Sequence, residues 1–344
     1  MKSDLSLSTC LLKSPLLAIG TVALTLALAG PALARIVTID PPNSIATYAW
    51  SLNDKGEITG FYFDGNDSTT KGFVRKPDGS ITTFENPTSE VTAAYGIDAK
   101  GRATGYWSTA DGNFPGFIRT TKGTLKPFSV SQAVTGTFPV GMNANSSIAG
   151  AWYDAFSVPH GFLRTADGTI ATFDVSGDTY GTFPTGINAG NAITGHYGDS
   201  SGFNHGFLRT QDGTITTFDG ARKASETFAM GINTAGTIAG YFQDSSGVSH
   251  GFERASGGTI SKFGPRGSTG TFAESINDNG DIAGYYEDSG GLAHGFVRSS
   301  DGSFVSFDPQ GSTGTFANTI NGNGRIVGFY TDASGDYHGF LRIP

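Results

Sequence analysis

The chain has little cysteine and little charge. Its 344 residues include one cysteine, Cys10, and 15% charged side chains, against about 25% in typical domains. A single cysteine excludes an internal disulfide, so packing must supply the stability. The formal net charge of −8 argues against nucleic acid as a partner. Long apolar runs are also scarce, and the apolar stretch at residues 16–29 is too short to span a bilayer.

That apolar stretch has the features of a secretory signal peptide. Lys2 and Lys13 precede it, and Ala-Leu-Ala at 32–34 fits a cleavage site. We expect residues 1–34 to be removed after Ala34. The mature chain would then be secreted or periplasmic, without cysteine and without a membrane span.

A unit of about 45 residues occurs seven times. Each copy carries a Gly-Phe pair, and successive pairs lie 44 or 45 residues apart. The pairs are at 72–73, 116–117, 161–162, 206–207, 251–252, 295–296 and 339–340. A fixed period in this range indicates a solenoid or a propeller.

Each unit contains four β-like segments with period-two alternation. Examples are residues 227–233, 281–286, 205–209 and 214–219, and Gly-rich turns separate such segments. Four short antiparallel strands per unit are typical of a propeller blade. The sequence therefore predicts an all-β fold, with residues 35–344 forming a single seven-bladed β-propeller.

The two ends of the chain complement each other. The last unit stops at Pro344 without a fourth segment, and residues 36–41 match the fourth-segment pattern around 307–309. We predict that the N-terminal strand completes the last blade, because this would leave no exposed sheet edge.

Units of the form G-I-N-x-x-G-x-I-A-G-Y-x-x-x-x-G-x-x-H-G-F-L-R resemble the bacterial extracellular HAF-type repeats. The resemblance covers residues 46–342, with H-G-F replacing H-A-F in five copies, while Lys71 and Pro115 replace the histidine in the first two. It implies export and a repeat fold, and it implies no particular reaction.

Five histidines occupy one position of the repeat, each six residues after an aspartate. We expect structural Asp–His hydrogen bonds. A shared zinc ion is not favoured, because its ligands must all lie about 2.1 Å from it and these histidines belong to different blades. An arginine two residues after every Gly-Phe should join blades through carboxylates or carbonyls. Loop aspartates such as Asp199 could bind calcium, but ordinary turns are favoured. We expect no cofactor.

Departures from the repeat are the candidate functional positions. One position before the Gly of the first segment differs in every unit, and it includes Trp50, Tyr95 and Glu274. In a propeller this position either faces a ligand or packs the hub. Trp107 and Trp152, near the end of the second segment, could stack on sugar rings as Trp50 could. This pattern favours a non-catalytic binding or interaction module for a polysaccharide or another envelope component.

An enzyme is the alternative. His196 is the one histidine outside the shared position. With His196 or a nearby Tyr197 or Tyr241 as base, and with Arg222 and Arg266 neutralising a carboxylate, this region could serve a lyase acting on a uronate-containing polymer. No G-x-S-x-G, phosphate loop or cysteine pair accompanies it.

Overall fold

The computed structural model describes residues 34–344, and these contain twenty-eight strands and no helix. The all-β prediction is therefore confirmed for this part of the chain. Within residues 34–344 there is no helix of the length and apolarity needed to cross a membrane. The predicted signal peptide at residues 1–34, with Cys10, lies outside the described residues except for Ala34.

Five of the six sheets have four strands each, taken in chain order and paired antiparallel. They contain β6 (Thr92–Ile97), β7 (Ala103–Trp107), β8 (Gly116–Arg119) and β9 (Leu125–Phe128); β10 (Gly136–Met142), β11 (Ile148–Tyr153), β12 (Pro159–Arg164) and β13 (Ile170–Phe173); β14 (Gly181–Ile187), β15 (Ile193–Gly198), β16 (Asn204–Arg209) and β17 (Ile215–Phe218); β18 (Glu226–Ile232), β19 (Ile238–Gln243), β20 (Ser249–Arg254) and β21 (Ile260–Phe263); and β22 (Gly270–Ile276), β23 (Ile282–Glu287), β24 (Ala293–Arg298) and β25 (Phe304–Phe307).

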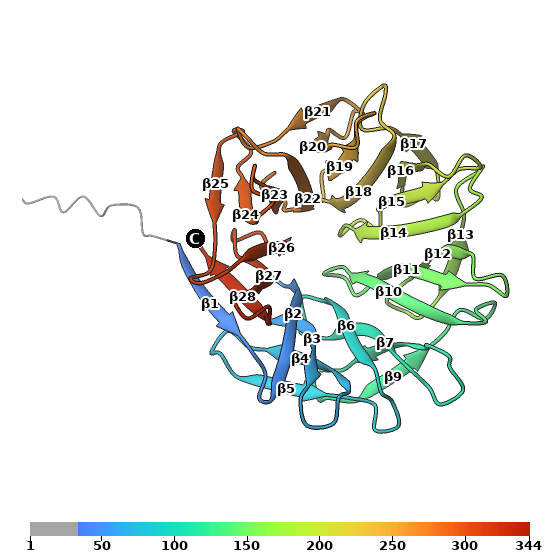
Figure 1. The fold of residues 1–344 in the computed structure, drawn as a ribbon. Coiled ribbons are helices and arrows are strands. Elements are labelled where there is room, and N and C mark those ends of the chain that lie inside the picture. The colour runs from blue at the N-terminus through green and yellow to red at the C-terminus, as the bar shows by residue number, and fades with distance from the viewer. Residues whose placement is uncertain (1–33) are drawn as a thin grey trace, which may run out of the picture. The chain divides into compact units, whose positions relative to one another are not determined.

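The sixth sheet has eight strands and contains both ends of the described chain. Its members are β1 (Arg35–Ile39), β2 (Ser44–Leu52), β3 (Ile58–Asp64), β4 (Thr70–Arg75), β5 (Ile81–Phe84), β26 (Gly314–Ile320), β27 (Ile326–Thr331) and β28 (Tyr337–Ile343). The N-terminal β1 pairs antiparallel with β28 along its whole length, as the sequence predicts (Figure 1). One parallel bridge, between Ala46 on β2 and Tyr337 on β28, joins β26–β28 and β1 to β2–β5.

The first strand of each four-strand group lies nearest the centre (Figure 1). These strands are β2, β6, β10, β14, β18, β22 and β26, and each contacts the next, with β26 contacting β2. Just after these strands, asparagine side chains donate hydrogen bonds to the neighbouring four-strand group. The amide nitrogen of Asn188 donates to the Asn233 carbonyl at 2.9 Å, and that of Asn321 donates to the Asn53 carbonyl at 3.0 Å.

The phenylalanine of each Gly-Phe pair is fully buried, as expected for core. These residues are Phe73, Phe117, Phe162, Phe207, Phe252, Phe296 and Phe340. Glycines opposite them are required by close packing. A Cβ on Gly240 would lie 2.1 Å from the Phe228 carbonyl oxygen and 2.8 Å from the Phe252 ring.

Most of the repeated arginines join neighbouring sheets through aromatic rings, whereas the sequence led us to expect carboxylate or carbonyl partners. The Arg254 guanidinium carbon lies 4.8 Å from the centre of the Phe218 ring on the preceding sheet, a cation–π contact. Six of the seven arginines make this contact. Arg298 additionally pairs with Glu253 at 2.9 Å. Arg75 has no such ring beside it, because β1 places Ile39 where β25 places Phe307.

Removing residues 35–41 should destabilise the protein and promote self-association, because β28 would become an exposed edge. Ile39, which is 1% exposed, offers a milder test. Ile39→Ala should lower the unfolding free energy by about 2–5 kcal/mol, measured by urea denaturation. Val305→Ala, at an exposed position, should change it little. A truncated protein that stays monomeric with an unchanged melting temperature would contradict the role of β1.

Candidate ligand-binding site

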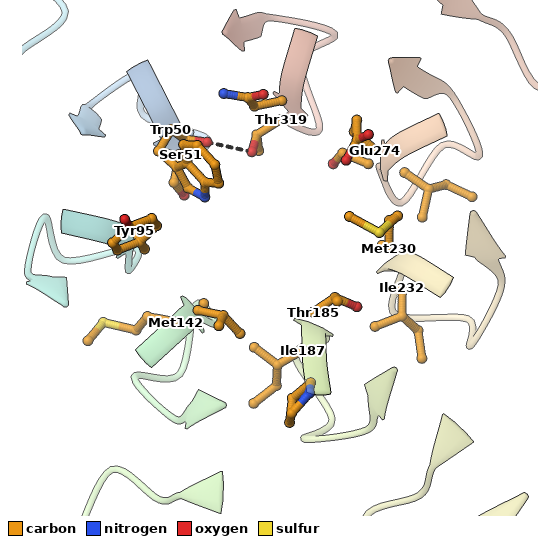
Figure 2. Close-up of a pocket in the computed structure, with 18 of the residues that line it drawn as sticks. Trp50, Ser51, Tyr95, Met142, Thr185, Ile187, Met230, Ile232, Glu274 and Thr319 are labelled. Atoms are coloured by element: carbon orange, nitrogen blue, oxygen red, sulfur yellow. Dashed lines mark hydrogen bonds between the residues drawn. The ribbon is translucent and has the colours of Figure 1, made fainter. Parts of the chain in front are cut away.

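A cavity of about 610 Å³ lies at the centre of the inner strands (Figure 2). All seven residues of the variable position line it. They are Trp50, Tyr95, Val140, Thr185, Met230, Glu274 and Asn318. The structure therefore places the variable position on a cavity wall, where the sequence left ligand contact and hub packing open.

A β-bulge explains why this position varies. In every inner strand the pairing register shifts at this residue, for example between Ala229 and Gly231 around Met230 and between Ala273 and Ser275 around Glu274. A bulge leaves its extra residue outside the ladder and redirects the side chain. The bulged residue can therefore change without disturbing strand pairing. The sequence showed the variation and gave no sign of the bulge.

One wall of the cavity is aromatic. The rings of Trp50 and Tyr95 meet edge to face, with centroids 5.1 Å apart, and the Tyr95 ring stacks on Tyr106 at 5.5 Å. Figure 2 shows both side chains on one side, with Met230 and Thr185 across the space. The wall offers two large rings held in fixed orientations to a ligand.

Glu274 is the one acidic residue among the described residues lining this cavity, and no lysine, arginine or histidine of residues 34–344 lines it. Its burial raises the pKa of the carboxyl to about 7. Glu274 lies among the rings of Tyr241 and Tyr285, whose own pKa values are raised, first by burial and then by the Glu274 charge.

A second cavity of about 440 Å³ lies beside the turns that end the inner strands. Asparagines of these turns line it, including Asn188, Asn233 and Asn277. Their amide groups are committed to the neighbouring turns. This cavity is therefore lined by the groups that connect the sheets.

Trp107 and Trp152 do not serve as the sugar platforms that we expected. They are 7% and 8% exposed. Trp107 stacks on Phe117 at 5.7 Å, and Trp152 stacks on His160 at 4.4 Å. Successive strand residues point to opposite faces of a sheet, and these two indoles point into the packing between sheets. Of the three tryptophans, Trp50 lines the cavity.

His196 is an apolar packing residue in this structure. Its ring stacks on Phe183 at 5.0 Å and meets Phe228 edge-on at 5.1 Å. Burial lowers the pKa of His196 to about 4, and its buried Nδ1 has no hydrogen-bond partner among residues 34–344. The equivalent residue is Tyr241 in the next unit and Tyr285 in the one after it. The ring is therefore neutral at pH 7 and occupies an aromatic position.

The structure does not bring the other residues of the lyase hypothesis to His196. Tyr197 follows it on β15 and packs beside His205, with ring centroids 5.3 Å apart. The Tyr241 ring lies against Phe228 at 4.9 Å, so Phe228 contacts both His196 and Tyr241. Arg222 and Arg266 are exposed on loops. A base and a carboxylate-binding arginine are thus not assembled around His196.

Three of the five predicted Asp–His hydrogen bonds are present, at His205, His250 and His294. His160 and His338 lie 3.6 and 3.5 Å from their predicted aspartates.

The structure adds a second aspartate beside four of the five histidines. His294 Nε2 lies 3.4 Å from Asp288, and its Nδ1 lies 2.8 Å from Asp308. Gly264 occupies the second acidic position beside His250, which contacts Asp244 alone at 2.8 Å. Asp174, Asp219 and Asp308 each lie fourteen residues after a histidine of the shared position. This spacing was the sequence signal for the second contact. Within residues 34–344 no group of three His, Cys, Asp or Glu residues could hold a metal ion.

The final histidine connects the two ends of the described chain. His338 Nδ1 lies 2.8 Å from Asp40, the residue that follows β1. Beside His160, His205 and His294 the second aspartate directly follows the outermost strand of the same sheet. Asp40 takes that place here, and the contact adds to the pairing of β1 with β28.

Comparisons with known proteins show the fold. No protein-family profile matches the chain, and no curated protein of similar sequence was found. Virginiamycin B lyase from Staphylococcus aureus is 16% identical, with a TM-score of 0.60 over 90% of this chain and 100% of that one. The β-propeller domain of the Trilobed protease from Pyrococcus furiosus is 9% identical, with a TM-score of 0.63 over 86% and 95%. The BP39L lectin from Burkholderia pseudomallei is 10% identical, with a TM-score of 0.55 over 86% and 96%. The chain therefore has a β-propeller fold.

His294→Gln should weaken the protein more at pH 6 than at pH 9. The hydrogen bond with Asp308 raises the pKa of His294 above 6.5, so the folded state favours the protonated ring. That stabilisation is complete below about pH 6.5 and is lost as pH rises through the folded pKa. Its size should be at most about 1 kcal/mol, measured by denaturation at each pH. Asp308→Asn should remove the same pH dependence, and a pH-independent difference would refute this role.

His196→Phe should keep or increase stability, by up to about 1 kcal/mol, because it replaces a buried unpaired nitrogen with an apolar ring. Thermal melting measures this. The variant should also keep every ligand that the protein binds. A folded variant that loses a measurable activity would show that His196 acts chemically.

Proposed function

We propose that the protein is an exported binding propeller with its ligand in the central cavity. The observation that carries this proposal is the bulged residue of each inner strand. Neighbouring positions repeat from unit to unit, whereas this one presents seven different side chains to one space. Packing a symmetric hub would favour one recurring residue. A single asymmetric ligand would favour seven different ones.

The proposal includes a closed ring of seven four-stranded blades. Pairing of β1 with β28 gives the last group its fourth strand. The Asn321 bond to the Asn53 carbonyl then links that group to the first one. A closed ring would hold the cavity walls at fixed separations. Export and membership of the HAF-type repeats are part of the same proposal and rest on the sequence.

The cavity suits a ligand of one or a few rings. Its volume of about 610 Å³ falls within the range of ~300–1,000 Å³ that is usual for small-molecule sites. Trp50 and Tyr95 offer faces for a sugar ring, and Thr185, Asn318 and Thr319 add polar atoms. We therefore propose the terminal part of a polysaccharide, or another small envelope component, as ligand. The likeness in fold to a lectin supports this choice.

The lyase alternative has less support. The described residues that line the cavity include no histidine and no arginine, and Glu274 is the one carboxylate. An enzyme that removes a proton beside a uronate carboxylate needs a cation near that carboxylate. A two-carboxylate hydrolase would need a second acid in the same space.

Trp50→Ala should weaken binding without unfolding the protein. Loss of a central aromatic contact typically costs about 2 kcal/mol or more, about 30-fold in affinity, and glycan arrays of envelope oligosaccharides would measure it. Trp107→Ala should instead lower stability by about 3–5 kcal/mol. Tyr180→Ala, at an exposed position, is the matched control. Glycan binding that survives both Trp50→Ala and Tyr95→Ala would remove the cavity from consideration.

A further inference from the structure

Three polar side chains that line the central cavity donate hydrogen bonds to the protein itself. The Thr319 hydroxyl donates to the Trp50 carbonyl at 2.8 Å, and the Thr185 hydroxyl donates to the Ala229 carbonyl. The Asn318 amide nitrogen donates to the Ala49 carbonyl at 3.2 Å. Three donors are thus directed at the protein itself. The lining also includes acceptors that receive no hydrogen bond from residues 34–344.

Two of these acceptors belong to neighbouring blades. The Glu274 carboxylate and the Asn318 amide oxygen receive no hydrogen bond from residues 34–344, and both side chains line the cavity. Glu274 is half-buried, and no lysine, arginine or histidine of residues 34–344 lines the cavity to pair with its carboxylate. A bound group with several N–H donors and a positive charge would supply the missing partner. An anion would find no cationic side chain on this wall.

The aromatic wall fits the same kind of ligand. Trp50 and Tyr95 lie on the side of the cavity away from Glu274 (Figure 2). Their rings can pack against the apolar face of a cyclic body, and their π-faces attract positive charge. A ring of ordinary size could therefore contact this wall while its substituent reaches the acidic one.

We propose that the cavity selects a ring-bearing organic ammonium group, held by Glu274 and Asn318 with its ring against Trp50 and Tyr95. This inference rests on the proposed function, because it assumes that the cavity is the binding site. An unacetylated amino sugar and a simple cyclic amine share the required chemistry. The raised pKa of Glu274 agrees with a carboxyl that lacks its partner.

Matched probes separate charge from shape. Calorimetric titration would compare cyclohexylmethylamine with cyclohexylmethanol, and a glucosamine tetramer with an N-acetylglucosamine tetramer. The aliphatic amine stays protonated up to about pH 10. At pH 8 it should bind at least about tenfold more tightly than the alcohol, and its binding should strengthen from pH 6 to pH 8 as Glu274 ionises.

Glu274→Gln should abolish that preference while leaving the alcohol's affinity unchanged. Glu90→Gln, which removes the same charge from an exposed loop residue, should leave the preference intact. Preferential binding of the glucosamine tetramer alone identifies an amino sugar as the ligand. Preferential binding of both amines over their uncharged counterparts supports ring-bearing organic ammonium groups in general as ligands.

Three results would overturn the ammonium assignment. Equal binding of amine and alcohol, with both lost in Trp50→Ala, would leave the cavity as a binding site and refute selection by charge. A neutral glycan whose binding depends on Trp50, found while no amine binds, would also refute selection by charge. A preference for amine that persists in Glu274→Gln would place the ammonium elsewhere. If no array glycan and no probe shows Trp50-dependent binding, the proposed function itself fails.

Discussion

The asparagine that follows six of the seven inner strands connects neighbouring sheets. Its side-chain oxygen accepts from the backbone of its own turn, as Asn188 does from the Ala192 amide at 2.9 Å. Its nitrogen donates to the backbone of the next turn, as Asn188 does to Asn233. Both ends of a buried amide are therefore satisfied, which such a group requires. Asp98 cannot donate, and there Ser146 donates to the Asp98 carboxylate at 2.7 Å instead.

Because these bonds fix the inner strands, the bulge next to them can carry variation. Pairing on both sides of the bulge stays regular, for example Ala229 with Gly240 and Gly231 with Ala239. The bulged side chain lines the central cavity and is not constrained by the strand pairing. A repeated scaffold can thus present one asymmetric set of groups, with the aromatic Trp50 and the acidic Glu274 in different units.

Other recurring residues stabilise the outer parts of each unit. Arg254 covers the Phe218 ring of the preceding sheet, and His294 joins two loops through Asp288 and Asp308. Burial among rings gives His196 a different role from these histidines, although the residue type is the same. Its low pKa follows from desolvation alone. The environment therefore decides whether a histidine here is a charged link or an apolar ring.

The sequence by itself determined the strand pattern, the repeat and the pairing of its two ends, because period-two alternation and turn residues are local properties and residues 36–41 match the missing segment. It also identified the Asp–His pairs, since their spacing is fixed within a unit. The tertiary structure alone decided which variable residues face the cavity. Register shifts redirect Trp50 and Glu274, and inter-sheet packing buries Trp107 and Trp152. His196 packs against the rings of Phe183 and Phe228. Those outcomes depend on contacts between units, which one unit's pattern does not encode.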